Sequence, residues 1–299
     1  MTFNGNTYYG AKGVRELTKD ILYNGQWQED GRTGVRSLSM FDAKVVIDEG
    51  FPFVKDILAS PRLAFEELWF FLRGETDTKI LEEKGVHFWK GNTSREFLDN
   101  RGLQHLPEGS LGAAYSKQWR DFGSGVKSHV GIDQLSKLLT SLEMDKYSRR
   151  HVVTLWNPLE EMDMPITPCW WAFNFVVMKD SNGVDVLHMK SVNRSLDVVF
   201  GASFALMQQR LLQMALCKMF DFELGVLSAD LSNVHIYENQ VSYALELITR
   251  LDSEGDCSIE LTKKPTCLES FVGLQWEDWD MTYSYNKEWM REKRPEMVA

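Results

Sequence analysis

Residues 60–74 read SPRLAFEELWFFLRG, and this stretch decides the central element of the expected fold. Ser60 and Pro61 are typical of a helix start, because Ser caps free N–H groups and Pro fits the first turn. Gly74 is a natural stop, since glycine readily takes the left-handed conformation that ends a helix. Between these ends the segment is apolar on most sides. We therefore expect a helix near the centre of the fold, with the carboxylate of Glu67 inside it.

The spacing of apolar residues elsewhere predicts further helices and strands. Helical spacing occurs in residues 132–142, 204–220 and 239–250. Strand-like runs occupy residues 151–156, 170–178 and 184–189, and the last two are joined by a turn at 180–183. Residues 91–112 have weak periodicity, which indicates an irregular insertion. The prediction is an α+β fold in a single domain over residues 1–299, with helices around a mostly antiparallel or mixed sheet.

Composition excludes several classes of protein. The chain has 299 residues, with 33 Lys and Arg against 43 Asp and Glu, and a formal net charge of −10 at pH 7. This acidic balance argues against a protein that holds nucleic acid by neutralising phosphates. No stretch approaches the roughly 18 apolar residues of a membrane span. The N-terminal residues lack a signal pattern, so we expect a cytoplasmic protein, in the host cytoplasm if the source is viral.

Cys169 is the first candidate for chemistry. The four cysteines share no CxxC or Cys/His spacing, so the sequence predicts neither a metal site nor a disulfide framework. Cys169 follows Pro168 at the start of an apolar strand, where its side chain could lie at the edge of a cavity. A nucleophile needs a positive neighbour that favours the thiolate, and Arg194 could supply it. The alternative is a buried core cysteine, the commonest fate of a free thiol.

Arginines form three clusters: Arg32, the pair Arg149 and Arg150, and Arg194 followed by Ser195. Guanidinium groups and a hydroxyl suit a terminal phosphate, because the forked donors of Arg match its oxygens. In a chain of net charge −10, each of these arginines could equally be an ordinary salt-bridge partner.

Three further polar residues stand in apolar surroundings. Alternation along a strand puts His235 and Tyr237 on one face, so both polar tips could reach one hydroxyl group. The alternative is a structural role for both. Glu67 lies in an almost wholly apolar helix, where a carboxylate is costly unless it is paired or functional.

Eight segments in order carry a resemblance. They are GRTG (31–34), EELWFFLRG (66–74), LGAAYSKQWR (111–120), SRR (148–150), PC (168–169), RSLD (194–197), Gly201 and HIY (235–237). Together they resemble the thymidylate synthase family, with a colinear match from about residue 14 to the C-terminus. Each motif alone is weak, but eight in order with family-like spacing are strong.

The resemblance implies a homodimeric thymidylate synthase-like fold, a pyrimidine nucleoside monophosphate substrate and 5,10-methylenetetrahydrofolate as one-carbon donor. Cys169 would be the nucleophile, Glu67 would organise proton-transfer waters, and Tyr115 would assist removal of the C5 proton. The resemblance also implies that the phosphate is bound by Arg32, Arg194 and Ser195, and by Arg149 and Arg150 of the other subunit. His235 and Tyr237 would bind the ribose hydroxyl. The folate would contact Trp89, Asp197, Gly201 and Phe204, and Asp197 would also be catalytic.

The departures from the family surround the base. Synthases carry an Asn that reads uracil O4 and N3 in a segment of the type Gly-Leu-Pro-Phe-Asn-Ile. Here residues 201–205 read GASFA, so Ala205 stands at the reading position. Alanine has no side-chain donor or acceptor, so uracil cannot be read in the usual way. Selectivity would then rest on other groups such as Asn193, Ser203 or an ordered water.

Three more positions differ from the usual synthase. Trp170 replaces a His after the nucleophile, Asn193 replaces a Gln, and Asn233 replaces an Asp. Residues 194–201 are more similar to phage deoxycytidylate hydroxymethylases, which carry Asp at the position of Ala205.

We therefore expect a pyrimidine-nucleotide 5-hydroxymethylase, with dCMP slightly ahead of dUMP as substrate. The alternative is reductive methylation, which makes dTMP from dUMP or 5-methyl-dCMP from dCMP. A nucleotide-binding paralogue without catalysis is a remote alternative, and a hydrolase that pairs a Cys with His151 or His188 lacks any local signature. Neither a metal nor a nucleic acid or membrane partner is expected.

Overall fold

A mixed sheet forms the frame of the fold. The computed structural model describes residues 6–31, 33–53, 59–125, 130–250, 257–283, 295 and 298. The path of the sheet is β1 (Asn6–Tyr9), β3 (Ser37–Ile47), β8 (Glu223–Tyr237), β6 (Asp185–Asn193), β5 (Trp170–Lys179) and β4 (Val152–Thr154), with β2 (Gln26–Gln28) on β3 and β7 (Leu196–Asp197) on β8. The pairs β1–β3, β6–β8 and β7–β8 are parallel and the others antiparallel. The α+β class and mixed sheet predicted from the sequence are confirmed.

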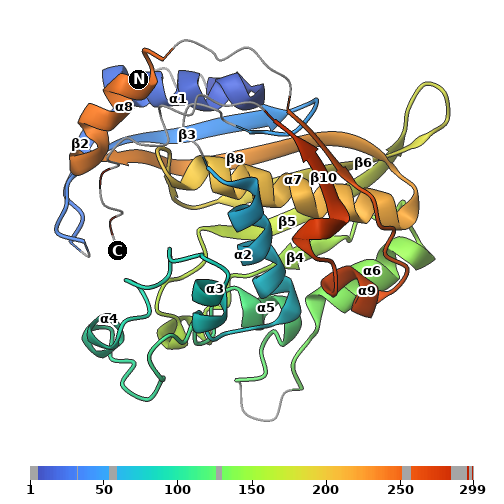
Figure 1. Cartoon of the computed structure of the whole chain (residues 1–299), viewed down its shortest axis with the longest axis horizontal. Helices are drawn as coiled ribbons and strands as arrows, with labels where there is room; N and C mark the ends of the chain where they lie inside the picture. Colours follow the sequence, from blue (N-terminus) through green and yellow to red (C-terminus); the bar gives the residue numbers. More distant parts are fainter. Residues whose placement is uncertain are drawn as a thin grey trace.

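Helices cover the sheet and extend below it (Figure 1). They are α1 (Gly10–Asn24), α2 (Pro61–Arg73), α3 (Lys79–Glu83), α4 (Arg95–Asn100), α5 (Ser116–Arg120), α6 (Gln134–Met144), α7 (Gly201–Phe220), α8 (Val241–Leu247) and α9 (Leu268–Val272). Helix α1 packs on β3, α7 packs on β6 and β8, and α2 lies between α7 and α5. A second, two-stranded sheet pairs β9 (Ser258–Leu261) with β10 (Trp279–Thr282). None of the helices in the described residues is long and apolar enough to cross a membrane.

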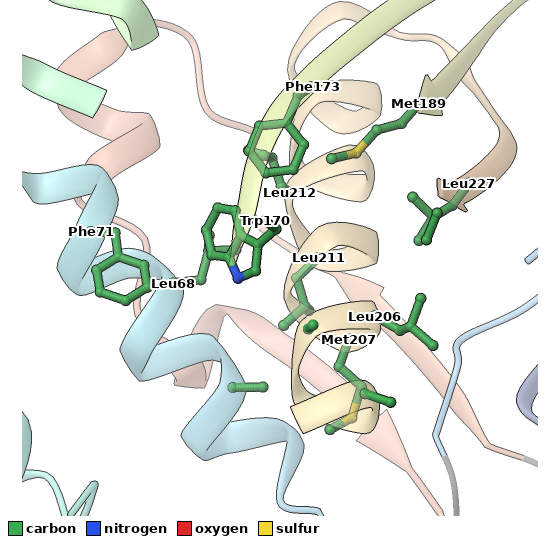
Figure 2. Close-up of a cluster of buried hydrophobic side chains, with 14 of the residues drawn as sticks. Leu68, Phe71, Trp170, Phe173, Met189, Leu206, Met207, Leu211, Leu212 and Leu227 are labelled. Atoms are coloured by element: carbon green, nitrogen blue, oxygen red, sulfur yellow. The ribbon is translucent and has the colours of Figure 1, made fainter. Parts of the chain in front are cut away.

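Helix α2 has the ends that its sequence predicts. The side chain of Ser60 accepts a hydrogen bond from the N–H of Leu63, and Gly74 closes the helix with φ 80°. Its residues from Ala64 to Leu72 are all buried. Figure 2 shows the core beside it, with Trp170 at the start of β5 between Leu68 of α2 and Leu211 of α7. The central position predicted for this helix is confirmed.

The hairpin of β5 and β6 is also as predicted. Asp180 Oδ1 accepts 2.8 Å hydrogen bonds from the N–H groups of Asn182 and Val184, and Gly183 has φ 81°. Strand β6 continues to Asn193, four residues beyond the predicted end. This extension places Asn193 opposite Trp170, the first residue of β5, which directly follows Cys169.

Other boundaries differ from the prediction. Residues 91–112 are not wholly irregular, because Ser94 caps the short helix α4 by accepting from the N–H of Phe97. The predicted helix 239–250 is shorter, since Glu238–Gln240 forms a 3-10 turn before α8. Helix α7 begins at Gly201, before the predicted residue 204.

Candidate active site

Cys169 is half-buried and lies immediately before β5. Its backbone is held on both sides. The N–H of Cys169 donates to Tyr115 Oη at 2.8 Å, and its carbonyl accepts from the N–H of Arg194 at 2.9 Å. The thiol is therefore carried by a backbone fixed to α5 on one side and to the β6–β7 connection on the other.

Arg194 provides the positive charge that the sequence suggested. Its Nε donates to the carbonyl of Pro168 at 3.0 Å, and a terminal nitrogen donates to that of Thr167 at 2.7 Å. The guanidinium also lies 5.7 Å from the ring centroid of Trp156. A cation is thus anchored to the two residues before Cys169, and its remaining N–H groups can bind an anion.

Tyr115 is buried against three aromatic rings. It stacks on Phe71 with ring centroids 4.8 Å apart and meets Trp170 and Trp89 edge-on. Burial and the nearby Cys169 raise the pKa of its phenol well above the ordinary value. The phenol thus keeps its proton at neutral pH while its oxygen accepts from Cys169. Its backbone has φ 31° and ψ −82°, a conformation that L residues rarely adopt.

Glu67 has both carboxylate oxygens bonded. Oε1 accepts from Trp89 Nε1 at 2.6 Å, and Oε2 accepts from Gln208 Nε2 at 2.7 Å. Burial raises the pKa of Glu67 to about 7, although both hydrogen bonds oppose the shift. The charge of Glu67 contributes to the raised pKa of Tyr115, so the two groups lie within electrostatic reach. A carboxyl with a pKa near neutrality is suited to proton exchange.

Asp197 lies in β7 at the start of the connection to α7. Oδ1 accepts from the N–H groups of Val199 and Phe200 at 2.9 and 3.3 Å, and Oδ2 accepts from Gln240 Nε2 at 2.8 Å. Burial raises the pKa of Asp197 to about 6 against these bonds. The oxygen of Gln240 accepts in turn from the N–H of Tyr237 at 3.2 Å. Gln240 therefore ties Asp197 to the end of β8.

His235 and Tyr237 are both buried at that end of β8. Their rings meet edge-on with centroids 4.9 Å apart. Nδ1 of His235 lies 3.0 Å from Asn233 Oδ1, so the neutral amide takes the place of a carboxylate partner. Register pairs His235 with Asp197 across β7 and β8. His235, with Tyr237 against its ring, therefore lies beside Asp197.

The start of α7 carries the residues expected near base and folate. Ala205 is buried and, as expected, brings no hydrogen-bonding group. Phe204 packs edge-on against Phe88 with ring centroids 4.8 Å apart. Gly201 is the first residue of the helix, and an added Cβ would make only ordinary contacts there. Nothing in the local packing therefore requires glycine at position 201.

The remaining predicted residues are those expected at the phosphate. Arg149 and Arg150 are exposed just before the edge strand β4, and neither guanidinium makes an ion pair with the described part of the chain. Ser195 is half-buried between Arg194 and β7. Arg32 lies outside the described residues.

Sequence reasoning missed Gln208 and Gln240, which bond Glu67 and Asp197. The sequence of α7 carries several polar residues, Gln208, Gln209, Arg210 and Gln213, so no local signal distinguished Gln208 as the partner of Glu67. The two histidines considered for a hydrolase are bonded elsewhere: His151 to Ser141 and the carbonyl of Lys146, and His188 to the N–H of Val226. The described residues contain no group of three or more His, Cys, Asp or Glu able to hold a metal ion.

Comparison with known proteins decides the family. The family model described as thymidylate synthase matches residues 13–290. The chain belongs to the thymidylate synthase family. Membership identifies it as a one-carbon transferase, and the resemblance drawn from the eight motifs is confirmed.

Several curated members of the family are similar to this chain. Thymidylate synthase of Saccharomyces cerevisiae is 33% identical over 249 residues, which cover 79% of this chain and 82% of the yeast protein. That of Candida albicans is 29% identical over 303 residues, covering 94% and 95%. The bifunctional dihydrofolate reductase-thymidylate synthase of Leishmania major is 34% identical over 235 residues, covering 76% of this chain but 44% of the relative. The chain thus spans less than half of the bifunctional protein.

Proposed function

We propose that this protein transfers a one-carbon unit from 5,10-methylenetetrahydrofolate to C5 of a pyrimidine nucleoside 5′-monophosphate, with dUMP as substrate and dTMP as product. The observation that carries the proposal is the position of Cys169, whose backbone is bonded to Tyr115 and to Arg194. The relatives named thymidylate synthase support reductive methylation of dUMP better than hydroxymethylation of dCMP, which the sequence had placed first.

The role of Cys169 follows from pyrimidine chemistry. C5 of the ring is a poor nucleophile until a thiolate adds at C6 and makes C5 enolate-like. Arg194, fixed to the carbonyls before Cys169, would supply the positive charge that such a nucleophile needs. Removal of the C5 proton needs a nearby acceptor. Waters organised by Glu67, with Tyr115 assisting, would accept this proton, because the pKa of Glu67, about 7, lets the carboxylate exchange protons at neutral pH while the phenol stays protonated.

The phosphate and ribose would be held by residues around this centre. Arg194, Ser195 and Arg32 would bind the 5′-phosphate, and His235 and Tyr237 the 3′-hydroxyl. Holding the phosphate places C6 beside the sulfur and converts remote binding energy into orientation.

The folate would lie over Trp89, Phe204 and the segment from Asp197 to Gly201. The residues present fit such a ligand, because Trp89 and Phe204 are only partly buried and Asp197 keeps lone pairs for ring N–H groups. When bound, the folate supplies the one-carbon unit and then the hydride that completes a methyl group. The chain's own residues orient it and manage protons at C5.

A second copy of the chain would complete the site. The face of the sheet away from α7 presents half-exposed or exposed apolar side chains, including Val152, Val176, Met178 and Val192. Arg149 and Arg150 project beside the edge strand β4, without an ion-pair partner in the described part of this chain. A homodimer would cover that face, and these arginines would reach the partner's phosphate site. We further propose that residues 1–299 form one catalytic domain, which the family match over residues 13–290 supports.

Hydroxymethylation is the second candidate, and the absence of a reading side chain at Ala205 favours it. In this reaction water adds to the exocyclic methylene at C5 and tetrahydrofolate is released. Hydride transfer instead gives a methyl group and dihydrofolate.

One incubation separates the candidates. Each of dUMP, dCMP, UMP and CMP is mixed with enzyme and 5,10-methylenetetrahydrofolate, and nucleotide mass and folate product are read together. The proposal expects methylated dUMP with dihydrofolate. Hydroxymethylated product with tetrahydrofolate would establish the second candidate, and no product from any nucleotide would overturn one-carbon transfer. Cys169→Ser serves as the control that should make none.

A further inference from the structure

A chain of three polar side chains lies between β6 and α7. Ser191, Asn193 and Gln209 are each at most 2% exposed. Ser191 Oγ donates to Gln209 Oε1 at 2.8 Å, and Asn193 Nδ2 donates to Ser191 Oγ at 3.3 Å. Asn193 Nδ2 also donates to the carbonyl of Asp230 at 3.3 Å. None of these bonds was anticipated from the sequence.

The backbone carbonyl of Asp230 fixes the donor-to-acceptor direction of the hydrogen bonds that join Asn193, Ser191 and Gln209. A backbone carbonyl can only accept, so the amide nitrogen of Asn193 must face it. The second hydrogen of that nitrogen then goes to Ser191, whose own proton goes to Gln209. Two atoms are left over: Asn193 Oδ1, an acceptor, and Gln209 Nε2, a donor. Both are buried and have no hydrogen-bond partner among the described residues.

The position of these atoms relates them to the base. Asn193 pairs with Trp170, the residue after Cys169, and precedes Arg194, whose N–H binds the carbonyl of Cys169. Gln209 stands one helical turn after Ala205 on the same face of α7, where Cβ atoms are about 5–6 Å apart. Alanine at position 205 fills less space than a longer side chain would take there. One turn of α7 therefore separates Gln209, with its unpartnered donor, from position 205, and Asn193, with its unpartnered acceptor, ends the strand next to Arg194.

We propose that Asn193 Oδ1 and Gln209 Nε2 together read the edge of the pyrimidine in place of residue 205, with Ser191 as the positioning residue that orients both amides. This inference rests on the proposed function. Uracil offers N3–H as donor beside O4 as acceptor, and cytosine offers its 4-amine beside N3. Both edges present one donor next to one acceptor, but in opposite order, so the fixed positions of the two free atoms would match only one of the bases.

The test measures binding of the base separately from binding of the sugar phosphate. Dissociation constants for dUMP, dCMP and 2-deoxyribose 5-phosphate are measured by calorimetry with wild type, Gln209→Leu and Ser191→Ala. In Gln209→Leu the preferred nucleotide should bind about tenfold or more weakly, as expected for a lost hydrogen bond and an unmatched polar atom. The sugar phosphate should bind as in wild type. Ser191→Ala should show a smaller loss of the same kind.

Gln213→Leu is the matched control, because Gln213 is a fully buried amide of the same helix that donates to the backbone carbonyls of Leu187 and Gly225. It should leave the ratio between nucleotide and sugar-phosphate affinity unchanged. An equal loss in this control, or unchanged ratios in both other variants, would overturn the inference. Should Gln209→Leu fail to fold, Ser191→Ala decides, since it removes a single oxygen. Product formation by wild type is scored separately, so a failure of the proposed reaction is distinguishable from a failure of base reading.

Discussion

Gln208 of α7 donates a 2.7 Å hydrogen bond to Glu67 of α2, across 141 positions of sequence. The bond joins two helices that pack together at the core of the protein. It favours the ionised carboxylate and so opposes the burial that raises the pKa of Glu67 to about 7. A residue outside the family motifs therefore helps to limit how far burial raises the pKa of Glu67.

Gln208→Leu should raise the pKa of Glu67 further, because a donor to the carboxylate is lost while burial remains. In the pH profile of kcat/KM, the apparent pKa that reports Glu67 should rise by about one unit. A hydrogen bond to a charged group is worth about 1.5–3 kcal/mol, and one pKa unit corresponds to about 1.4 kcal/mol. Gln213→Leu removes another buried amide from α7, which bonds backbone carbonyls instead. An identical profile in wild type and Gln208→Leu would show that the bond does not set this ionisation.

Glu67→Gln should stabilise the fold at alkaline pH while abolishing most activity. The pKa of Glu67 is raised from 4.5 to about 7, so the folded state holds a proton that the unfolded chain releases between these values. Stability from this group is complete below pH 4.5 and falls as pH rises to 7, by about 3 kcal/mol at most. Denaturant unfolding at pH 5 and pH 8 measures the difference. The prediction fails if the variant loses as much stability as wild type between the two pH values.

Arg149→Ala should weaken nucleotide binding by about 1–3 kcal/mol, the range for a charge-assisted contact. If Arg149 serves the partner's site, mixed dimers of Arg149→Ala and Cys169→Ser chains should recover activity, because one of their two sites has both residues intact. The activity of purified heterodimers is compared with that of each homodimer. Verified heterodimers without recovery would place Arg149 in its own subunit's site or outside the site altogether.

Ala205→Asn should shift preference toward uracil, and Ala205→Asp toward cytosine. Asn can donate to O4 and accept from N3–H, whereas Asp accepts from the exocyclic amine of cytosine. A matched hydrogen bond is worth about 1 kcal/mol and a buried mismatch costs about 1–3 kcal/mol, so the two variants should differ in preference by about tenfold or more. The measurement is kcat/KM for dUMP and dCMP. Equal ratios in wild type and both variants would mean that position 205 does not face the base.

Short sequence signals predicted the ends of one helix and the turn of one hairpin. Helix α2 could be bounded from Ser60 and Gly74, and the β5–β6 hairpin from its turn, because caps and turns act over a few residues. Strand β8 was recognised only near His235, since small residues such as Gly225 and Ala229 occupy much of its buried face and weaken the alternation of large apolar side chains.

The candidate site residues were mostly predicted one at a time, and the hydrogen bonds that join residues from distant helices were not. Arg194 was expected near Cys169 because both flank one hairpin. Nothing local could show that Trp89 and Gln208 converge on Glu67, because these contacts depend on how distant helices pack. Likewise, the absence of an amide at position 205 was evident in the sequence, but the free amide atoms nearby emerged only from the fold.

The backbone at Tyr115 sets a limit for engineering. A residue held at φ 31° and ψ −82° costs about 1–3 kcal/mol, and its surroundings must hold it there. Changes that relaxed this segment would raise thermal tolerance, but they would also draw the phenol away from the N–H of Cys169. Selection for heat resistance alone would therefore favour substitutions near Tyr115 that raise thermal stability and lower the catalytic rate.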